Sequence, residues 1–154
     1  MSIHIRVVTP DDCPLLVQLI RELAEYEKLA DAMKATPDDL HRSIFLEKSA
    51  HAVLAYAAEE VIGFALYFFN YSTFVGRKGL YLEDLYIRPE YRGKGYGKAL
   101  LLYLIQVAQD EGCGRMEWSV LNWNTPAIDF YNSLGAQAMN EWTVYRLDPN
   151  RFKN

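Results

Sequence analysis

The sequence predicts an α/β domain in which helices flank a sheet. Segments with strand-like alternation and segments with helical spacing of apolar residues follow one another along the chain. A strand-like run at 80–87 also leads through a glycine-rich turn into a helix-like run at 98–105. With 154 residues, 51% of them apolar, the chain is long enough for a sizeable core and is globular rather than disordered. No linker, repeat or low-complexity segment is present, so we expect residues 1–154 to form one domain.

The N-terminal elements are a strand and two helices. Residues 3–8 alternate and predict the first strand. Asp11 or Asp12 can cap the first helix, which has Pro14 in its first turn and leucine and isoleucine side chains at helical spacing after it. A threonine–proline–aspartate start predicts a second helix over 36–48.

The middle of the chain predicts a hairpin, a central strand and a long helix. Apolar runs at 51–58 and 61–71 flank a polar turn and are typical of a hairpin. Residues 80–88 form the central strand. The helix over 98–111 is apolar nearly all round, which predicts burial, and Gly112 stops it.

The C-terminal part predicts a strand, a short helix and two closing strands. Residues 115–121 form the strand. Thr125 caps a helix over 126–134, which starts with a proline and is followed by a glycine. Residues 136–139 and 142–147 are the two candidate closing strands.

The turn between the central strand and the long helix is the most informative stretch of the chain. It reads Arg92-Gly93-Lys94-Gly95-Tyr96-Gly97 and continues with Lys98. Backbone N–H groups at a helix start lack intrahelical partners, and the helix dipole favours negative charge there. Glycines also let the backbone approach a phosphate closely. The turn therefore predicts a phosphorylated ligand.

Two familiar phosphate motifs do not fit this turn. The dinucleotide fingerprint G-x-G-x-x-G fits Gly93 and Gly95 but meets a lysine at the third glycine. The Walker loop ends correctly in glycine–lysine but has Ala99 in place of the hydroxyl residue. What remains is R-x-x-G-x-G, formed by Arg92, Gly95 and Gly97. A tight connection with solvated basic residues is the structural alternative.

Charge and cysteine usage narrow the function classes. The net charge of −4 argues against a nucleic-acid surface and fits a cationic partner better. Cys13 and Cys113 stand far apart, which indicates a reducing compartment and no disulfide framework. The histidines His4, His41 and His51 form no metal-ligand motif, so we expect no metal. No signal peptide or membrane-length apolar run is present, which predicts a cytoplasmic protein without a membrane partner.

Two adjacent carboxylates, Glu83 and Asp84, lie inside the otherwise apolar central strand. Burying carboxylates without partners costs several kcal/mol, so they need a reason to be there. Adjacent side chains of a regular strand point to opposite faces. Either one carboxylate has a structural role, or a β-bulge turns one of them toward a site. Beside the glycine-rich turn we favour a functional pair.

The motif R-x-x-G-x-G in this context resembles the acyl-CoA signature of the GNAT N-acetyltransferases, and the order of elements is that of the GNAT fold. The resemblance implies a mixed, mostly antiparallel central sheet that is splayed at its central strands. It also implies acetyl-CoA as co-substrate, with its pyrophosphate in the turn. The implied coenzyme-binding residues are Leu85, Tyr86, Ile87, Arg92, Gly93, Lys94, Gly95, Tyr96, Gly97, Lys98, Asn124, Pro126 and Tyr131.

Further blocks look like the spermidine/spermine (diamine) and thialysine acetyltransferase subfamily. They lie at 20–27, 63–71, 80–85, 91–93 and 123–124 and extend over nearly the whole chain. This similarity implies transfer of an acetyl group to a primary amine of a small cationic acceptor, such as a polyamine, a diamine or a lysine-like amine. It also implies a homodimer, to which closing strands would add pairing edges.

The same resemblance assigns roles to individual residues. Tyr131 is the implied general acid and Glu83 the implied water-linked base, although Asp84 stays an alternative base. The implied amine site comprises Tyr26, Glu27, Glu83, Asp84, Glu141 and Trp142. An aspartate that contacts the polyamine in the mammalian enzyme falls at Ser72 here, so diamines and lysine-like amines rank level with spermidine.

These parts suit a direct attack of the amine on the thioester. A primary amine has a reference pKa of about 10.4 and must lose a proton first, which a carboxylate can accept through water. A backbone N–H on the splayed strand can stabilise the oxyanion, and a tyrosine hydroxyl can protonate the leaving thiolate. The alternatives are an acetyltransferase for a protein N-terminus or an aminoglycoside-like amine, and a non-catalytic acyl-CoA-binding module.

Overall fold

A five-stranded sheet organises the N-terminal part of the chain. The computed structural model describes residues 2–153, and the chain divides into two compact units, residues 1–119 and residues 120–154. The sheet lies in the first unit and has the order β1-β2-β3-β4-β5. Its strands are β1 (His4–Val7), β2 (His51–Ala57), β3 (Glu60–Ser72), β4 (Arg77–Ile87) and β5 (Met116–Trp118). The first three pairings are antiparallel and β4 pairs with β5 in parallel, which confirms the mixed, mostly antiparallel sheet.

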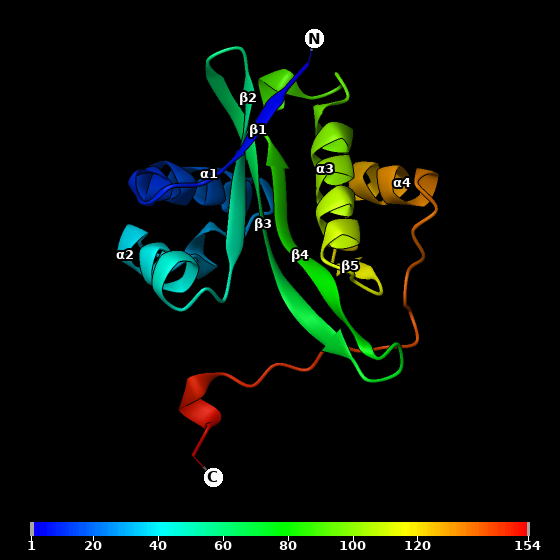
Figure 1. The fold of residues 1–154 in the computed structure, drawn as a ribbon. Helices are drawn as coiled ribbons and strands as arrows, with labels where there is room; N and C mark the ends of the chain where they lie inside the picture. Colours follow the sequence, from blue (N-terminus) through cyan, green and yellow to red (C-terminus); the bar gives the residue numbers. More distant parts are fainter. Residues whose placement is uncertain (1, 154) are drawn as a thin grey trace. The chain divides into compact units, whose positions relative to one another are not determined.

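Helices cover both faces of this sheet. The helices α1 (Cys13–Tyr26) and α2 (Pro37–His41) lie on one side of it, and α3 (Tyr96–Asp110) lies on the other (Figure 1). On the α1 side, Leu16 and Leu19 of the helix pack in one core cluster with Phe64 of β3 and Tyr86 of β4. Short helical turns complete the chain at Pro10–Asp12, Ala30–Ala32, Arg42–Leu46, Pro89–Tyr91 and Pro149–Arg151.

The boundaries of two helices differ from the expected ones. Residues 36–48 form not one α-helix but the short α2 followed by a π-helical turn at 42–46. Thr36 caps α2, since its side chain accepts a hydrogen bond from the Asp39 N–H at 3.2 Å. The helix α3 starts at Tyr96, two residues before the expected position, because Gly95 takes a φ of 83° and serves as its N-cap.

The second unit is described by itself and is built on α4 (Thr125–Ser133). Its N-cap is Asn124 rather than the expected Thr125, so Pro126 is the second residue of the helix rather than the first. Gly135 follows the helix with a φ of 85°, and the Ala136 N–H donates to the Tyr131 carbonyl at 3.2 Å. The helix therefore ends through a left-handed glycine, as the sequence indicates.

The prediction of two closing strands is wrong for this structure. Among the described residues of the second unit, neither 136–139 nor 142–147 is a strand. Alternation fixes only which side chains share a face, whereas a strand also needs a neighbour that pairs with its backbone. The described part of that unit, residues 120–153, contains no strand that could provide one, and Val144 and Tyr145 are 85% and 92% exposed. The expected strand at 115–121 is likewise limited to β5.

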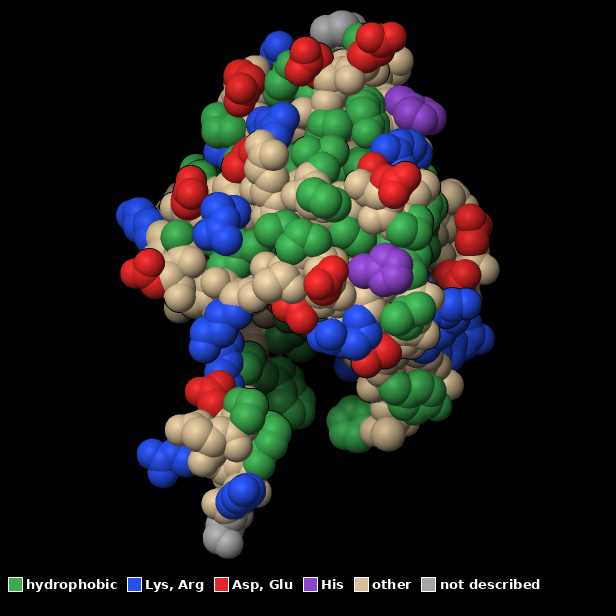
Figure 2. All heavy atoms as spheres, turned by 90° about the vertical axis from the view of Figure 1, so that its left-hand side faces the viewer, with side chains coloured by type: hydrophobic (Ala, Val, Ile, Leu, Met, Phe, Trp, Pro, Cys, Tyr) green, Lys and Arg blue, Asp and Glu red, His purple; other side chains and the backbone are tan. Residues whose placement is uncertain are grey.

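The outside of the molecule shows no single dominant charge on the face that carries α1 and α2. Acidic, basic and apolar side chains are interspersed there (Figure 2). Within residues 2–153, every helix is too short or too polar to span a lipid bilayer. Nor do the described residues bring three or more His, Cys, Asp or Glu side chains together in a way that would hold a metal ion.

Candidate active site

A β-bulge brings the two carboxylates of the central strand to the same place. Leu66 of β3 pairs with Asp84, whereas the next residue, Tyr67, pairs with Leu82. Glu83 is therefore an extra residue in β4 without a partner on β3, and the alternation of side chains is interrupted at this point. Glu83 and Asp84 both line one pocket, although they are adjacent in a strand. Of the two explanations that the sequence left open, the structure shows the bulge.

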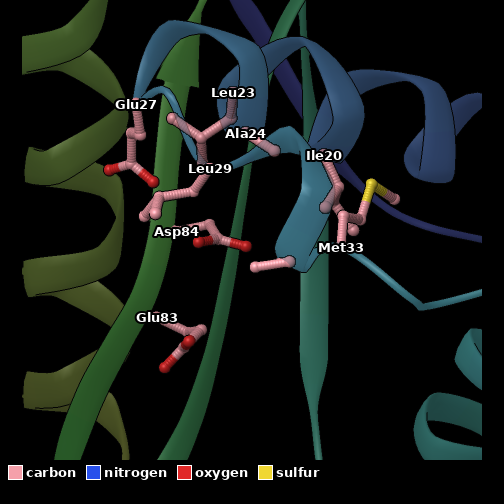
Figure 3. A pocket seen from close by; sticks show the side chains of 9 residues that line it. Ile20, Leu23, Ala24, Glu27, Leu29, Met33, Glu83 and Asp84 are labelled. Carbon is pink, nitrogen blue, oxygen red and sulfur yellow. The ribbon is translucent and has the colours of Figure 1, made fainter.

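The pocket lies between β4 and the end of α1. It has a volume of about 270 Å³. Glu27, Asp84 and Glu83 follow one another along one side, and Ile20 and Met33 stand on the opposite side (Figure 3). The lining residues are Ile20, Leu23, Ala24, Glu27, Leu29, Ala32, Met33, Glu83 and Asp84. A small ligand with an ammonium group and an apolar arm fits this division of polarity.

Burial and mutual repulsion shift the acidity of the pocket carboxylates. Desolvation, helped by the negative charges of Glu83 and Glu27, raises the pKa of Asp84 to about 7. Desolvation and the charge of Glu83 also raise the pKa of Glu27 above its ordinary value. Like charges in one pocket favour an incoming cation, because a cation relieves the repulsion between them.

Local backbone geometry explains how Glu27 and Leu29 reach the pocket. The helix α1 ends at Tyr26, and Lys28 takes a left-handed φ of 62°. The Leu29 N–H then donates to the Ala24 carbonyl at 2.8 Å, which closes the helix end. No signal in the sequence indicates this reversal or the pocket-lining residues Ala32 and Met33 that follow it, because no apolar periodicity marks that stretch.

The other acidic residues of α1 do not line this pocket. Glu22 is paired with Arg88, whose Nε and Nη2 donate to its carboxylate at 3.1 and 3.0 Å. Glu25 is exposed and does not line the pocket. Tyr26, an expected amine-site residue, lies under the Arg92 guanidinium rather than in the lining, with 4.6 Å from Arg92 Cζ to its ring centroid.

The glycine-rich turn has the geometry of an anion site. Gly93 and Gly95 have φ values of 77° and 83°, which L-residues with side chains rarely adopt. A Cβ at either position would meet nothing within 4 Å, so the conformation rather than crowding requires glycine there. The first N–H groups of α3 follow directly and lack helical partners. Lys94 and Lys98 are exposed beside them.

Strands β4 and β5 separate next to the bulge. The parallel pairing extends only from Leu80 to Leu82 of β4, opposite Met116–Trp118. Leu85, Tyr86 and Ile87 therefore continue β4 without β5 beside them, which is the splay that was expected. The Ile87 carbonyl accepts a hydrogen bond from Arg92 Nε at 2.8 Å, and Tyr86 is buried.

The remaining predicted site residues belong to the second unit. Asn124 is buried, Pro126 is exposed, and Tyr131 is half-buried with its ring centroid 5.7 Å from that of Phe130. Glu141 and Trp142 are exposed in the irregular segment after α4. Their roles stay predictions.

Comparison with known proteins identifies the family. A family model described as "Acetyltransferase (GNAT) family" matches residues 16–136. The chain belongs to the GNAT acetyltransferase family. It is therefore an acyltransferase of the N-acetyltransferase type, as the turn and the order of elements predicted.

Relatives named as N-acetyltransferases align with almost the whole chain. A thialysine N-epsilon-acetyltransferase of Bos taurus is 40% identical over 95% of this chain and 92% of its own length. An L-ornithine N5-acetyltransferase of Arabidopsis thaliana is 31% identical over 96% of this chain and 85% of its own. Among solved structures, an integron cassette protein of the V. cholerae mobile metagenome has a TM-score of 0.79 and 30% identity, covering 97% and 94% of the two chains.

The raised pKa of Asp84 predicts a pH-dependent stabilisation by Asp84→Asn. The pKa of Asp84 is about 7 in the folded protein, against the ordinary value of 3.8. At low pH the carboxyl is protonated and does not destabilise the fold. As the pH rises to about 7, the cost of ionising Asp84 in the folded protein lowers the free energy of unfolding. The substitution should therefore change the melting temperature little at pH 4 and raise it by several degrees at pH 8. The pKa shift limits the stabilisation by Asp84→Asn to about 4 kcal/mol. Each kcal/mol corresponds to a change of about 2–4 °C in the melting temperature.

Thermal unfolding followed by circular dichroism at both pH values checks this prediction. Glu25→Gln is the matched control, because it removes an exposed carboxylate of α1 outside the pocket. An equal rise at pH 4 and pH 8, or a fall at pH 8, would contradict a destabilising ionised Asp84.

Proposed function

We propose that this protein transfers the acetyl group of acetyl-CoA to a primary amine of a small cationic acceptor, namely a polyamine, a diamine or a thialysine- or lysine-like amine. The observation that carries the proposal is the bulge at Glu83, which places two adjacent carboxylates in one pocket with Glu27. Such a pocket selects cations, and its apolar side at Ile20 and Met33 suits a methylene or thioether arm.

The acceptor amine is activated by a carboxylate and attacks the thioester directly. Glu83 is exposed, so a water molecule can link it to the ammonium group and carry the proton away. Asp84 is the alternative base, but its pKa of about 7 leaves it about half protonated in the empty pocket at neutral pH. Its carboxylate form instead holds a second cationic group once the acceptor has entered.

The coenzyme lies along the splayed strand and the glycine-rich turn. Backbone groups of Leu85, Tyr86 and Ile87 pair with the pantetheine arm, because β5 does not cover this part of β4. A β4 N–H also stabilises the oxyanion. The pyrophosphate binds the N–H groups of the turn and the start of α3. The residues of this anion site are Arg92, Gly93, Lys94, Gly95, Tyr96, Gly97 and Lys98.

The second unit supplies the acid and further contacts. Tyr131 protonates the leaving thiolate, while Asn124 and Pro126 contact the pantetheine arm and Glu141 and Trp142 contact the acceptor. We infer that both units form one catalytic domain, because the family match extends from the first unit into the second. We place this domain in the cytoplasm, as the cysteine usage suggests.

The acceptor is expected to be a dibasic amine rather than a neutral one. The bovine and plant relatives are named for thialysine and ornithine, which are both amino acids with a side-chain amine. Ser72 lies outside the pocket lining and is buried at 7% exposure, where its hydroxyl accepts a hydrogen bond from the Val75 N–H at 3.1 Å. It serves the β3–β4 turn and offers no charge to a long polyamine.

Turnover of acetyl-CoA with a panel of amines tests the proposal. The panel contains thialysine, lysine, ornithine, diaminopropane, spermidine, an aminoglycoside, an N-terminal peptide and a neutral amine such as glycinamide at high pH. Release of the free thiol of coenzyme A is measured for each amine. We expect the highest kcat/KM for a short dication. Preference for the peptide or the aminoglycoside, or no turnover of any amine, would refute the proposed acceptor class.

Replacing Glu27 by Gln should weaken acceptor binding more than coenzyme binding. Removing one carboxylate of the pocket is expected to raise the acceptor KM about tenfold at low ionic strength. The effect should shrink at high salt, because the Debye length falls from about 30 Å at 0.01 M to about 3 Å at 1 M. Steady-state kinetics at both salt concentrations measures it, and the exposed Glu25→Gln on the same helix is the control.

The protein should also be a homodimer. The apolar side chains of Trp142, Val144, Tyr145 and Leu147 are 62–92% exposed, and a second copy would cover such a surface. Light scattering at micromolar concentration is expected to give twice the chain mass of 17.8 kDa. A monomer mass would exclude this assembly without affecting the proposed chemistry.

A further inference from the structure

Helix α1 is attached to the strand–turn–helix segment at two points that lie one helical turn apart. At the first point, Glu22 accepts both bonds from Arg88 and a third from the Tyr86 hydroxyl at 3.3 Å. Arg88 also donates to the Val61 carbonyl at 3.0 Å. Glu22 and Tyr26 are four residues apart and share one face of the helix. The hydrogen bonds of Glu22 therefore hold in place the face of α1 that also carries Tyr26.

The second point is the contact between Tyr26 and Arg92. The Arg92 Cζ lies 4.6 Å from the Tyr26 ring centroid and 5.5 Å from that of Tyr86, and its Nε donates to Ile87. These are cation–π distances, and such contacts favour one orientation of the guanidinium. None of the ion pairs found among residues 2–153 uses Arg92. Its charge is therefore available to an anion in the glycine-rich turn that it begins.

Tyr26 is also joined directly to the acidic pocket. It is the last residue of α1, and the next residue, Glu27, lines the pocket. Leu29 follows through the left-handed Lys28 and is tied back to α1 by its bond to Ala24. Backbone hydrogen bonds close this helix end, so the Tyr26 ring and the two lining residues behind it belong to one tied segment.

We propose that the contact between Arg92 and Tyr26 couples the two substrate sites, so that an anion held in the turn tightens the binding of a cationic amine in the pocket. An anion orients the guanidinium, the guanidinium holds the tyrosine ring, and the ring fixes Glu27 and Leu29 in their places in the pocket. Arg92 and Tyr26 are positioning residues in this scheme. The inference rests on the proposed function, since it requires coenzyme in the turn and acceptor in the pocket.

The test is a binding cycle with CoA and thialysine, or with the panel amine of highest kcat/KM if that is another. Isothermal titration measures the dissociation constant of the amine with and without saturating CoA. The ratio of the two constants is the coupling factor, and by linkage the amine must tighten CoA binding by the same factor. We expect a factor of at least about five for the parent protein.

Three variants separate coupling from simple support of the fold. Tyr26→Leu removes the ring and should bring the factor close to one, whereas Tyr26→Phe keeps the ring and should keep the factor. Arg92→Lys keeps the charge but removes the planar group and the Nε bond, and should lower the factor. Tyr56→Leu is the matched control, because it removes another ring under an arginine, 5.3 Å from Arg6 Cζ, and should leave the factor unchanged.

The outcomes distinguish this inference from the proposed function. A merely structural Tyr26 would weaken amine binding equally with and without CoA, and that result in Tyr26→Leu and Arg92→Lys would overturn the coupling. A factor of one in a parent protein that acetylates amines would also overturn it and leave the proposed function standing. A parent that acetylates no amine would refute the proposed function, and the coupling with it. If Tyr26→Leu fails to fold, the coupling factor of Arg92→Lys is compared with that of the control Tyr56→Leu, and this comparison decides whether the contact couples the two sites.

Discussion

Replacing Tyr131 by Phe is expected to reduce kcat by roughly 10²–10⁴-fold while leaving the fold and the affinity for CoA intact, because a positioned proton donor contributes about that much to the rate. The change removes one hydroxyl from a half-buried side chain of α4 and keeps the ring that contacts Phe130. Single-turnover release of thiol from acetyl-CoA measures the chemical step, and isothermal titration with CoA measures the affinity.

Tyr145→Phe provides the comparison for this variant. It removes the same hydroxyl from a residue of the second unit that is 92% exposed, so it should leave the chemical step unchanged. A Tyr131→Phe protein as fast as Tyr145→Phe would show that Tyr131 only packs against its neighbours and that another group protonates the thiolate.

Replacing Gly95 by Val is expected to raise the KM for acetyl-CoA by about 10–100-fold. The φ of 83° at this N-cap is unfavourable for a β-branched residue, so the turn must change its backbone path. Each charge-assisted hydrogen bond lost to the pyrophosphate then costs about 1.5–3 kcal/mol, and about 1.4 kcal/mol corresponds to a tenfold change. Titration with CoA gives the affinity independently of turnover.

Gly76→Val tests whether backbone strain alone explains the loss. Gly76 has a φ of 75° and, like Gly95, no atom within 4 Å of a Cβ built on it, but it lies in the β3–β4 turn rather than in the glycine-rich turn. The two variants should lose similar thermal stability, and only Gly95→Val should lose coenzyme affinity. Unchanged CoA affinity in a folded Gly95→Val protein would show that the pyrophosphate does not bind at this turn.

Much of the fold could be predicted because its determinants are local. The hairpin β2–β3 follows from two apolar runs around a polar turn. The central strand β4 and the helices α1, α3 and α4 follow from apolar spacing together with a proline or glycine near one end. The glycine-rich turn is the clearest case, since Gly93 and Gly95 adopt the backbone conformations that only glycine takes readily. The closing strands were mispredicted because a strand needs a partner that local alternation does not supply.

The candidate site could be predicted only in part. The sequence alone established that two carboxylates interrupt an apolar strand just before a glycine-rich turn, which is enough to indicate a site there. Only the tertiary structure decided that both carboxylates face one pocket, because the direction of Glu83 depends on the register between β3 and β4. Likewise, only packing decided that Glu22 is neutralised by Arg88 while Glu27 stays in the pocket. Charges that look equivalent along a helix differ in function because distant strands determine which of them find a partner.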